Sequence, residues 1–442
     1  MTHATTKSRL TCDGIEAHVQ TQQYDRGTRV LLLAPVMPSD GGNGLAMRAG
    51  FFLDAYARIA NVDLIVAPVA GSSEPSTFAK SRTRRVEVLK LTSADSHYSL
   101  VASVADPKAR LNAFRTYGRP SLAAFVRPAL PDFCSLVANS RYDVIHIFRL
   151  YLAELSAPWL AENSSCAKLV MDCDENDALA YRRIAAIERR AGNVIMADTA
   201  EAEALAFTRF AEYWLPQFDV VIAASRQEAR SLAAFGVRTL TVANVVPEPK
   251  RSQRRAANVL TILFIGTLGY APNVDALMWF YTRVFHRLQR ALAYRLRLII
   301  VGRYPPAAVA RLRFQRGIEV WDNASDISRC YSSADLVIAP LRAGGGTRIK
   351  VIEAGRYGVP MVTTRLAAEG TTFLNGVDML VADSAEAFFR ACRLLMRNRS
   401  LAARLRRHAR AKANRDYSQA YWRLQVANLV GEANAKLPKN CG

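Results

Sequence analysis

The residue pattern best suited to binding an anion lies in the second half of the chain. Three glycines (Gly344–Gly346) follow an apolar run that ends at Pro340, and a helix is expected from an N-cap at Thr347 to about Tyr357. A glycine loop before a helix lets backbone N–H groups approach an anion, and the helix dipole favours negative charge there. The loop lacks the Gly-Lys-Ser/Thr of a Walker A motif and does not match GxGxxG.

Three charged side chains extend this chemistry along the expected helix. Arg348 and Lys350 put cations in the first turn, where the dipole prefers acids, and a diphosphate bound there would compensate for this. Glu353 falls one turn below Lys350, and a carboxylate at that depth can accept hydrogen bonds from both hydroxyls of a ribose. The alternative is structural: a tight turn, followed by an i,i+3 ion pair between Lys350 and Glu353.

Short apolar runs separated by helix-length segments must position these residues. The runs are continuous and mostly rich in Val, Ile and Leu, as is typical of strands buried on both faces of a parallel sheet. Each half of the chain therefore predicts a doubly wound α/β domain. The expected strands span residues 29–35, 62–67, 85–91, 143–148, 168–172, 219–224, 260–265, 296–301, 335–339 and 360–364.

A segment with two prolines and a basic run (246–255) separates the two halves, as a surface linker would. It predicts an N-terminal domain over 1–246 and a C-terminal domain over 256–415. After about residue 384 no further strands are expected. Ligands of such sheets bind beyond the carboxyl ends of the strands, so the cleft between the domains is the expected active site.

Polar residues at two strand ends of the first half are further candidates. His146 is expected at the end of its strand and facing the cleft, or else as a satisfied strand-end histidine. Arg149, just after it, could bind a phosphate. Asp172 directly ends the next strand and belongs to an acidic cluster (172–177). The alternative for this cluster is an acid-rich helix N-terminus, and Asp172 is the member favoured for a functional role.

Length and composition narrow the class of protein. A chain of 442 residues suits two domains, and 50% hydrophobic with 22% charged residues is a globular composition. No apolar window approaches the roughly 18 residues of a spanning helix, and the first residues lack the apolar core of an export signal. The seven cysteines include no CxxC pair. A cytoplasmic protein without a metal site or cofactor is expected.

The charge is unusual. Lys and Arg total 59 against 38 Asp and Glu, a net charge of +21, which should attract a polyanion. Between Phe388 and Arg415 there are ten basic residues and no acid. This stretch predicts a surface for anionic lipid on the inner face of the membrane, or a solvated helical face whose leucines pack inward. No nucleic-acid-binding module is recognisable, so nucleic acid is not an expected partner.

The segment from Gly344 to Thr364 resembles the donor-binding signature of GT-B glycosyltransferases, in particular the retaining family 4, glycosyl transferases group 1. Other stretches are similar to segments of that family in the same order. They are 38–44, 219–225 with Asn244, 264–273, 298–302 and 331–340. The resemblance covers roughly residues 28–385 and is strongest in the C-terminal half. It implies two Rossmann-like domains facing across a cleft, with 1–246 on the acceptor side and 256–415 on the donor side. It also implies a C-terminal helical crossover, in which a last helix (416–442) packs back onto the first domain.

The resemblance also implies roles for matching residues. Glu353 corresponds to the second glutamate of the family's E-x7-E motif, which holds the nucleotide ribose, and residues 320–322 would read the base. Arg348 and Lys350 would be catalytic by stabilising the departing diphosphate, with His146 and Asp172 acting on the N-terminal side. The remaining donor-binding residues would be Gly41, Gly42, Gly44, Gly266, Thr267, Gly345, Gly346 and Thr347.

Two departures from the family pattern are present. Gly345 stands eight positions before Glu353, where the family has its first glutamate. The Arg and Lys that many members carry after the first strand of this domain are absent from 266–270, and Arg348 with Lys350 would supply that charge instead.

The expected function is transfer of a sugar from a nucleotide diphosphate-sugar to a glycan or lipid-linked acceptor, with retention, in polysaccharide or glycolipid biosynthesis. A nucleotide-sugar epimerase or phosphorylase of the same architecture, and a non-catalytic sugar-nucleotide-binding homologue, are the alternatives.

Overall fold

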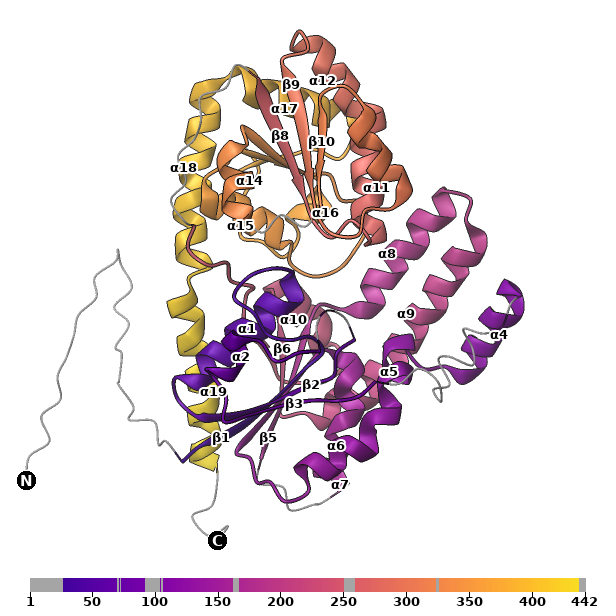
Figure 1. Cartoon of the computed structure of the whole chain (residues 1–442), viewed down its shortest axis with the longest axis vertical. Helices are drawn as coiled ribbons and strands as arrows, with labels where there is room; N and C mark the ends of the chain where they lie inside the picture. The colour runs from indigo at the N-terminus through magenta and orange to yellow at the C-terminus, as the bar shows by residue number, and fades with distance from the viewer. Residues whose placement is uncertain are drawn as a thin grey trace, which may run out of the picture.

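The computed structural model describes residues 27–69, 71, 73–91, 104, 106–161, 167–249, 259–322 and 326–436. They form two α/β domains, one above the other in Figure 1, with the yellow C-terminal helices running along one side of both. Each domain is built on a sheet of parallel strands, in the orders β3-β2-β1-β4-β5-β6-β7 and β10-β9-β8-β11-β12-β13. The predicted fold class is confirmed.

The strands of the first sheet are β1 (Arg29–Ala34), β2 (Asn61–Val66), β3 (Arg85–Val88), β4 (Val144–Phe148), β5 (Lys168–Asp174), β6 (Val220–Ala223) and β7 (Thr239–Thr241). Those of the second sheet are β8 (Leu260–Ile265), β9 (Leu296–Val301), β10 (Ile318–Trp321), β11 (Leu336–Ala339), β12 (Met361–Thr363) and β13 (Leu380–Val381).

The helices of the first domain are α1 (Gly44–Ala57), α2 (Thr77–Lys80), α4 (Pro107–Tyr117), α5 (Ser121–Val126), α6 (Leu130–Val137), α7 (Ala157–Ala161), α8 (Asp177–Arg190), α9 (Val194–Trp214) and α10 (Arg226–Ala233). Those that follow are α11 (Ala271–Phe280), α12 (His286–Ala291), α13 (Ala307–Ala310), α14 (Ile327–Ser333), α15 (Ile349–Tyr357), α16 (Arg365–Ala368), α17 (Ala385–Arg397), α18 (Arg399–Asp416) and α19 (Gln419–Lys436). Short 3-10 turns are Arg127–Ala129, Leu150–Ser156, Leu215–Gln217 and Arg311–Phe314, and Tyr281–Phe285 is a π-helical turn.

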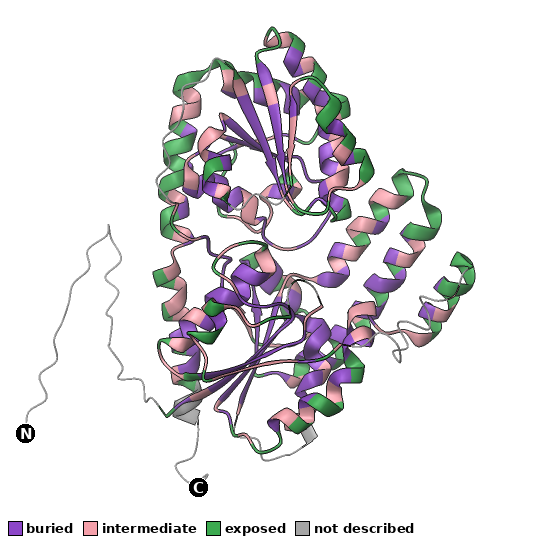
Figure 2. Ribbon diagram, viewed as in Figure 1, coloured by how far each residue is buried: buried purple, intermediate pink, exposed green. Residues whose placement is uncertain are grey.

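All ten expected strands are present, and three further strands were not expected. The three, β7, β10 and β13, each lie at an edge of their sheet and hold two to four residues. Figure 2 shows the inner strands as the buried centre of each domain. An edge strand is covered less completely, so its sequence need not be a continuous apolar run.

Both sheets bring the loops of interest to one place. Strand order reverses between β1 and β4 in the first sheet and between β8 and β11 in the second. A crevice opens beyond the carboxyl ends of the strands at such a switch point. The glycine-containing segments 41–44, 266–267 and 344–346 follow β1, β8 and β11, so all three start from these switch points.

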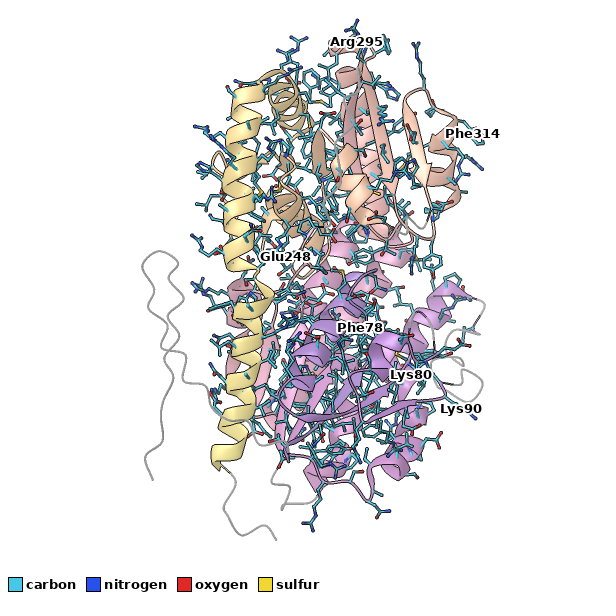
Figure 3. All side chains as sticks on the ribbon, turned by 60° about the vertical axis from the view of Figure 1, so that its left-hand side comes forward. Phe78, Lys80, Lys90, Glu248, Arg295 and Phe314 are labelled. Carbon is cyan, nitrogen blue, oxygen red and sulfur yellow. The ribbon has the colours of Figure 1, made fainter. Side chains whose placement is uncertain are left out.

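The last helix returns to the first domain. Val426, Leu429 and Val430 of α19 are buried in the core formed with β1 and β2. Lys168 Nζ donates to the Leu429 carbonyl at 3.2 Å and pairs with Glu432 at 2.9 Å. The long helical side of the molecule that α18 and α19 form is in front in Figure 3, beside the labelled linker residue Glu248.

The predicted domain limits at 246 and 256 fall between the two sheets, which end and begin at β7 and β8. Residues 1–26, 250–258 and 437–442 of the predicted domains and linker lie outside the described residues. The exact limits stay a prediction.

The basic stretch from Phe388 to Arg415 forms most of α17 and α18. Leu395 and Leu405 are 4% and 0% exposed, whereas Leu394 is 46% exposed. The two buried leucines match the alternative of a solvated face with leucines packed inward. Over the part of the chain that the structure describes, none of the helices combines the length and apolarity needed to cross a membrane.

Candidate active site

The glycine loop connects β11 to α15, as predicted, but the helix begins one residue later than expected. Arg348, not Thr347, is the N-cap residue, with extended φ and ψ and no side-chain capping bond. The Thr347 hydroxyl instead donates to the Ala224 carbonyl of the first domain at 3.3 Å. A contact across the two domains has therefore replaced the local cap, and Gly358 ends the helix at a φ of +63°.

Arg348 is buried beside the glycine loop, and two of its nitrogen donors have no hydrogen-bond partner. Its residue is 9% exposed, and neither Nε nor Nη2 has a hydrogen-bond partner. Nη2 lies 3.4 Å from where a Cβ on Gly344 would be. Burial lowers the pKa of this guanidinium. Buried donors without partners are costly, and an anion at the loop would satisfy them.

Lys350 faces the loop after β8. Its Nζ donates to Asn273 Oδ1 at 2.8 Å and lies 2.8 Å from where a Cβ on Gly266 would be. Asn273 in turn donates to the Thr267 carbonyl at 2.8 Å. The structure thus brings Gly266, Thr267 and Lys350 together, and a Cβ at position 266 would displace the amine from this place. Burial, with the nearby Arg348 charge second, lowers the pKa of Lys350 to about 7.

Glu353 is one turn further along α15 and is 6% exposed. Its Oε2 accepts a hydrogen bond of 2.7 Å from the Tyr331 hydroxyl. Burial raises the pKa of this carboxyl group. Because Lys350 bonds Asn273 and Glu353 bonds Tyr331, the alternative of a simple ion pair between the two does not describe the structure.

The first domain closes on α15 from the other side. Gly44 begins α1, and a Cβ there would lie 2.6 Å from Cδ1 of Ile349, the residue between Arg348 and Lys350. Gly41 and Gly42 have open space around them, and Gly42 has a φ of +99°. Their contact with a donor stays a prediction, as does base recognition by residues 320–322 at the end of β10.

Two carboxylates from the first domain lie against the glycine loop, and sequence reasoning missed both contacts. Glu228 Oε1 accepts from the Gly346 N–H at 3.3 Å, and burial raises the pKa of Glu228. Glu175 Oε2 lies 2.5 Å from where a Cβ on Gly345 would be. No local pattern indicates either contact, because the loop and the two glutamates are more than 100 residues apart in sequence.

Arg183 also bridges the domains. Its Nη1 donates to the Gly344 carbonyl at 3.1 Å, and its Nη2 pairs with Glu369 at 2.7 Å. These two contacts hold α8 of the first domain against the glycine loop of the second.

His146 does not face the cleft as expected. It is the central residue of β4, 0% exposed, and its Nδ1 lies 2.8 Å from the Tyr56 hydroxyl. Its ring packs edge-to-face on Phe52 at 4.5 Å. Burial lowers the pKa of His146, which favours the neutral ring. Side chains alternate between the faces of a strand, and this one points under α1, so any catalytic part stays a prediction.

Asp172 is likewise fully buried, in a bidentate pair with Arg48. Both bonds are 2.8 Å, from Nε and Nη2 of Arg48. Burial is the largest single influence and by itself raises the pKa of Asp172, but the Arg48 charge and the hydrogen bonds from His146 and Arg48 together lower it. Arg48 also donates to Asn244 Oδ1 at 2.9 Å. These contacts tie α1, β5 and the segment after β7 together, and a catalytic role for Asp172 stays a prediction.

Arg149 forms ion pairs with the other three acids of the cluster 172–177. It is 5% exposed and pairs with Asp177, with Glu175 at 3.0 Å and with Asp174 at 3.5 Å. Burial raises the pKa of Asp177 to about 7. Asn176 caps α8 through a bond from the Leu179 N–H, so the end of the cluster is the helix N-terminus considered as an alternative.

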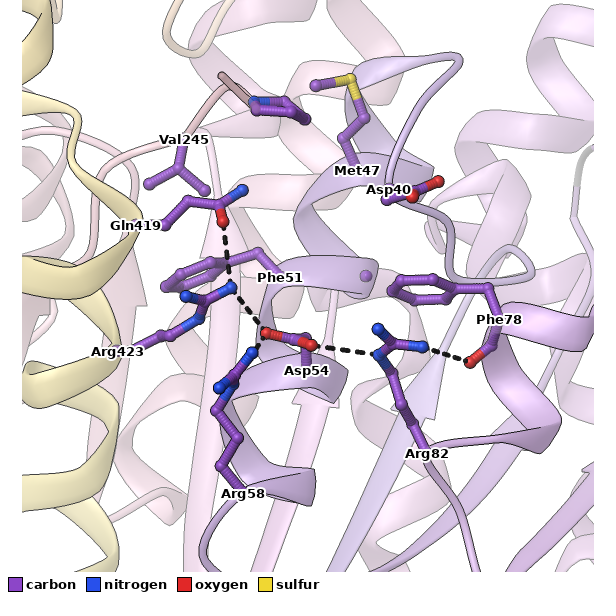
Figure 4. A pocket seen from close by; sticks show the side chains of 12 residues that line it. Asp40, Met47, Phe51, Asp54, Arg58, Phe78, Arg82, Val245, Gln419 and Arg423 are labelled. Atoms are coloured by element: carbon purple, nitrogen blue, oxygen red, sulfur yellow. Dashed lines mark hydrogen bonds and ion pairs between the residues drawn. The ribbon is translucent and has the colours of Figure 1, made fainter.

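A cavity of about 270 Å³ lies between α1, α2 and the start of α19 (Figure 4). The Asp54 carboxylate forms ion pairs with three arginines: Arg58 at 3.2 Å, Arg82 at 3.1 Å and Arg423 at 2.7 Å. Burial by itself raises the pKa of Asp54, but these arginines outweigh it and lower it. The cluster holds α19 on the first domain.

Comparison with known proteins agrees with this architecture. Residues 259–398 match the family model of glycosyl transferases group 1. No curated protein sequence matches the chain. Among solved structures, sucrose-phosphate synthase from Thermosynechococcus elongatus has a TM-score of 0.65 at 13% identity, covering 93% of this chain and 100% of that one.

Two further structures are similar over nearly all of the chain. HepE from Anabaena, solved in complex with UDP-glucose, has a TM-score of 0.57 at 17% identity and covers 91% of this chain and 99% of its own. A glycosyltransferase from Rickettsia africae has a TM-score of 0.58 at 14% identity, covering 94% and 100%. The chain therefore has the GT-B fold, and its second domain carries the match to glycosyl transferases group 1.

Proposed function

We propose that this protein is a glycosyltransferase that takes a sugar from a nucleotide diphosphate-sugar and transfers it to a glycan or lipid-linked acceptor. The observation that carries the proposal is the unsatisfied guanidinium of Arg348, buried at the mouth of a glycine loop. Lys350 and the N-terminus of α15 lie beside it. Together they form an anion site that a diphosphate would fill.

Glu353 supports the nucleotide part of the proposal. A buried carboxylate one turn below Lys350, with Tyr331 donating to one of its oxygens, is suited to accept from ribose hydroxyls. HepE, of similar fold, was solved with UDP-glucose, which makes uracil the first base to try.

The chemistry is mainly electrostatic. Bond cleavage leaves negative charge on the departing diphosphate, and preorganised N–H groups with Arg348 and Lys350 stabilise it without rearrangement. Closing the first domain over the loop, through contacts such as Thr347 to Ala224, would exclude water and so favour transfer over hydrolysis. Retention of configuration and a part in polysaccharide or glycolipid synthesis belong to the proposal through the family resemblance alone.

We also propose a peripheral location on an anionic membrane surface, which suits a lipid-linked acceptor. The net charge of +21 supports it. So do the consecutive residues Val194, Ile195 and Met196 at the start of α9, which are 59%, 38% and 59% exposed. Co-sedimentation with vesicles of anionic against zwitterionic lipid tests this part by itself, and equal binding to both would contradict it.

The test of the donor site is thermal unfolding of wild type and Glu353→Ala with UDP, GDP and ADP and their sugar conjugates. A ligand at about 100 times its Kd adds roughly 2.7 kcal/mol to the stability of a protein that binds it only when folded. One nucleotide class should stabilise wild type and the matched surface variant Glu212→Ala, but not Glu353→Ala. If no nucleotide stabilises wild type, the donor site is refuted.

Transfer is measured separately, as incorporation of labelled sugar into added glycan or polyprenyl-phosphate acceptors. Incorporation that requires the acceptor distinguishes a transferase from an epimerase, which changes the sugar on the nucleotide. Donor binding without any product would favour the non-catalytic homologue.

A further inference from the structure

Glu175 lies at a sharply bent point of the first domain that faces the glycine loop. It directly follows β5, and its N–H bonds the Cys173 carbonyl at 2.6 Å in a tight turn. The residue before it, Asp174, has a φ of +58°, and Arg149 on the neighbouring strand end has a φ of +83°. Left-handed backbone at non-glycine residues is strained and persists only where the surroundings impose it, commonly at functional sites.

The carboxylate is held by one oxygen and presents the other. Oε1 accepts from Arg149 Nη1 at 3.0 Å. Oε2 lies 2.5 Å from where a Cβ on Gly345 would be and 3.2 Å from where one on Gly346 would be. A side chain at position 345 would therefore collide with Glu175. The same Cβ would lie 2.9 Å from the Cβ of Ala180 on α8, so Glu175 and Ala180 of the opposite domain together leave no space for a side chain here.

Arg348 gives an independent indication that a ligand belongs here. Its partnerless Nε and Nη2 are buried beside the same loop, and the Glu175 charge acts on it strongly enough to oppose the lowering of its pKa by burial. The site thus combines free cationic donors and a free carboxylate oxygen. A ligand that satisfies both carries an anionic group and hydroxyl groups.

We propose that Glu175 binds a hydroxyl group of the donor sugar and so supplies, from the first domain, a carboxylate that the glycine loop itself lacks. The inference rests on the proposed function. A diphosphate on Arg348 and Lys350 would leave the attached sugar at the glycine loop, where Oε2 of Glu175 accepts a hydrogen bond from one of its hydroxyl groups. Because the carboxylate belongs to the other domain, the sugar is recognised only when the two domains are closed.

The test compares two ligands of one base, UDP and UDP-glucose first, or the pair that stabilises wild type in the panel above. Glu175→Gln keeps the shape of the side chain and removes its charge. The variant should bind the nucleoside diphosphate within about threefold of wild type. It should bind the nucleotide sugar about 10-fold more weakly, as expected when a charged hydrogen-bond acceptor is replaced by a neutral one. The KM for the nucleotide sugar should rise in parallel.

Glu212→Gln, an exposed residue of α9 with the same change of charge, should change neither affinity. Normal binding of the nucleoside diphosphate shows that Glu175→Gln is folded. If the variant binds both ligands like wild type, or loses both equally, Glu175 does not read the sugar and the inference is overturned while the donor site stands. If wild type binds neither ligand, the proposed function fails first and the inference fails with it.

Discussion

Lys350 should make donor binding depend on pH near neutrality, where Asp177 also has a pKa of about 7. Its amine is buried, its one hydrogen-bond acceptor is the neutral Asn273, and its pKa is about 7 in the free protein. The charges that face it are Arg348, which lowers the pKa, and Glu353, which raises it. A bound diphosphate would raise the pKa of Lys350, so binding at or above pH 7 must take up a proton.

The size of the effect follows from the fraction of Lys350 that is already protonated. With a pKa of about 7, roughly half of the amines are charged at pH 7 and roughly 3% at pH 8.5. If only the charged form binds, the association constant falls by up to about 15-fold over this interval. The diphosphate of a nucleotide sugar is esterified at both ends and does not titrate here, so the nucleotide sugar is the ligand to use.

Calorimetric titration at pH 7.0, 7.75 and 8.5, in two buffers of different ionisation enthalpy, measures affinity and proton uptake together. Wild type should take up about half a proton at pH 7 and close to one at pH 8.5. Lys350→Met should bind more weakly at pH 7 and show neither dependence, whereas the exposed-residue control Lys80→Met should match wild type. A wild-type affinity that is flat from pH 7 to 8.5, without proton uptake, would refute the contact between Lys350 and the diphosphate.

Two further variants test the framework of the site. Asp172→Asn removes the closer of the two carboxylates paired with the buried Arg48 guanidinium, leaves Asp174 at 3.7 Å, and should cost about 3 kcal/mol in urea unfolding. Full stability with loss of sugar transfer would instead assign Asp172 to the chemistry. In Gly302→Ala the new Cβ would lie 1.8 Å from the Gly266 carbonyl oxygen, which should cost about 1–3 kcal/mol or more. Because Gly266 faces Lys350, donor affinity should fall as well, and unchanged affinity would show that the loop after β8 does not contact the donor.

Local patterns in the sequence were sufficient to predict ten of the thirteen strands that the structure describes and much of the donor loop. Inner strands of a parallel sheet are covered on both faces, so each of them appears in the sequence as a continuous apolar run. The glycine loop that leads into α15 could be recognised from its three consecutive glycines. The edge strands β7, β10 and β13 were not predicted, because these partly buried strands carry no continuous apolar run. Arg348, Lys350 and Glu353 lie at the start of α15, as predicted. Their positions on one helix follow from their spacing in the sequence alone.

The tertiary structure alone determined the contacts between segments that are far apart in the chain. The N-cap moved to Arg348 because Thr347 bonds Ala224. Arg48, unremarkable in sequence, neutralises Asp172 124 residues away. The glycine that looked like a missing glutamate at position 345 makes room for the carboxylate of Glu175. Such partners are chosen by the packing of two domains, and no periodicity within either segment encodes the other, so only the folded chain could reveal them.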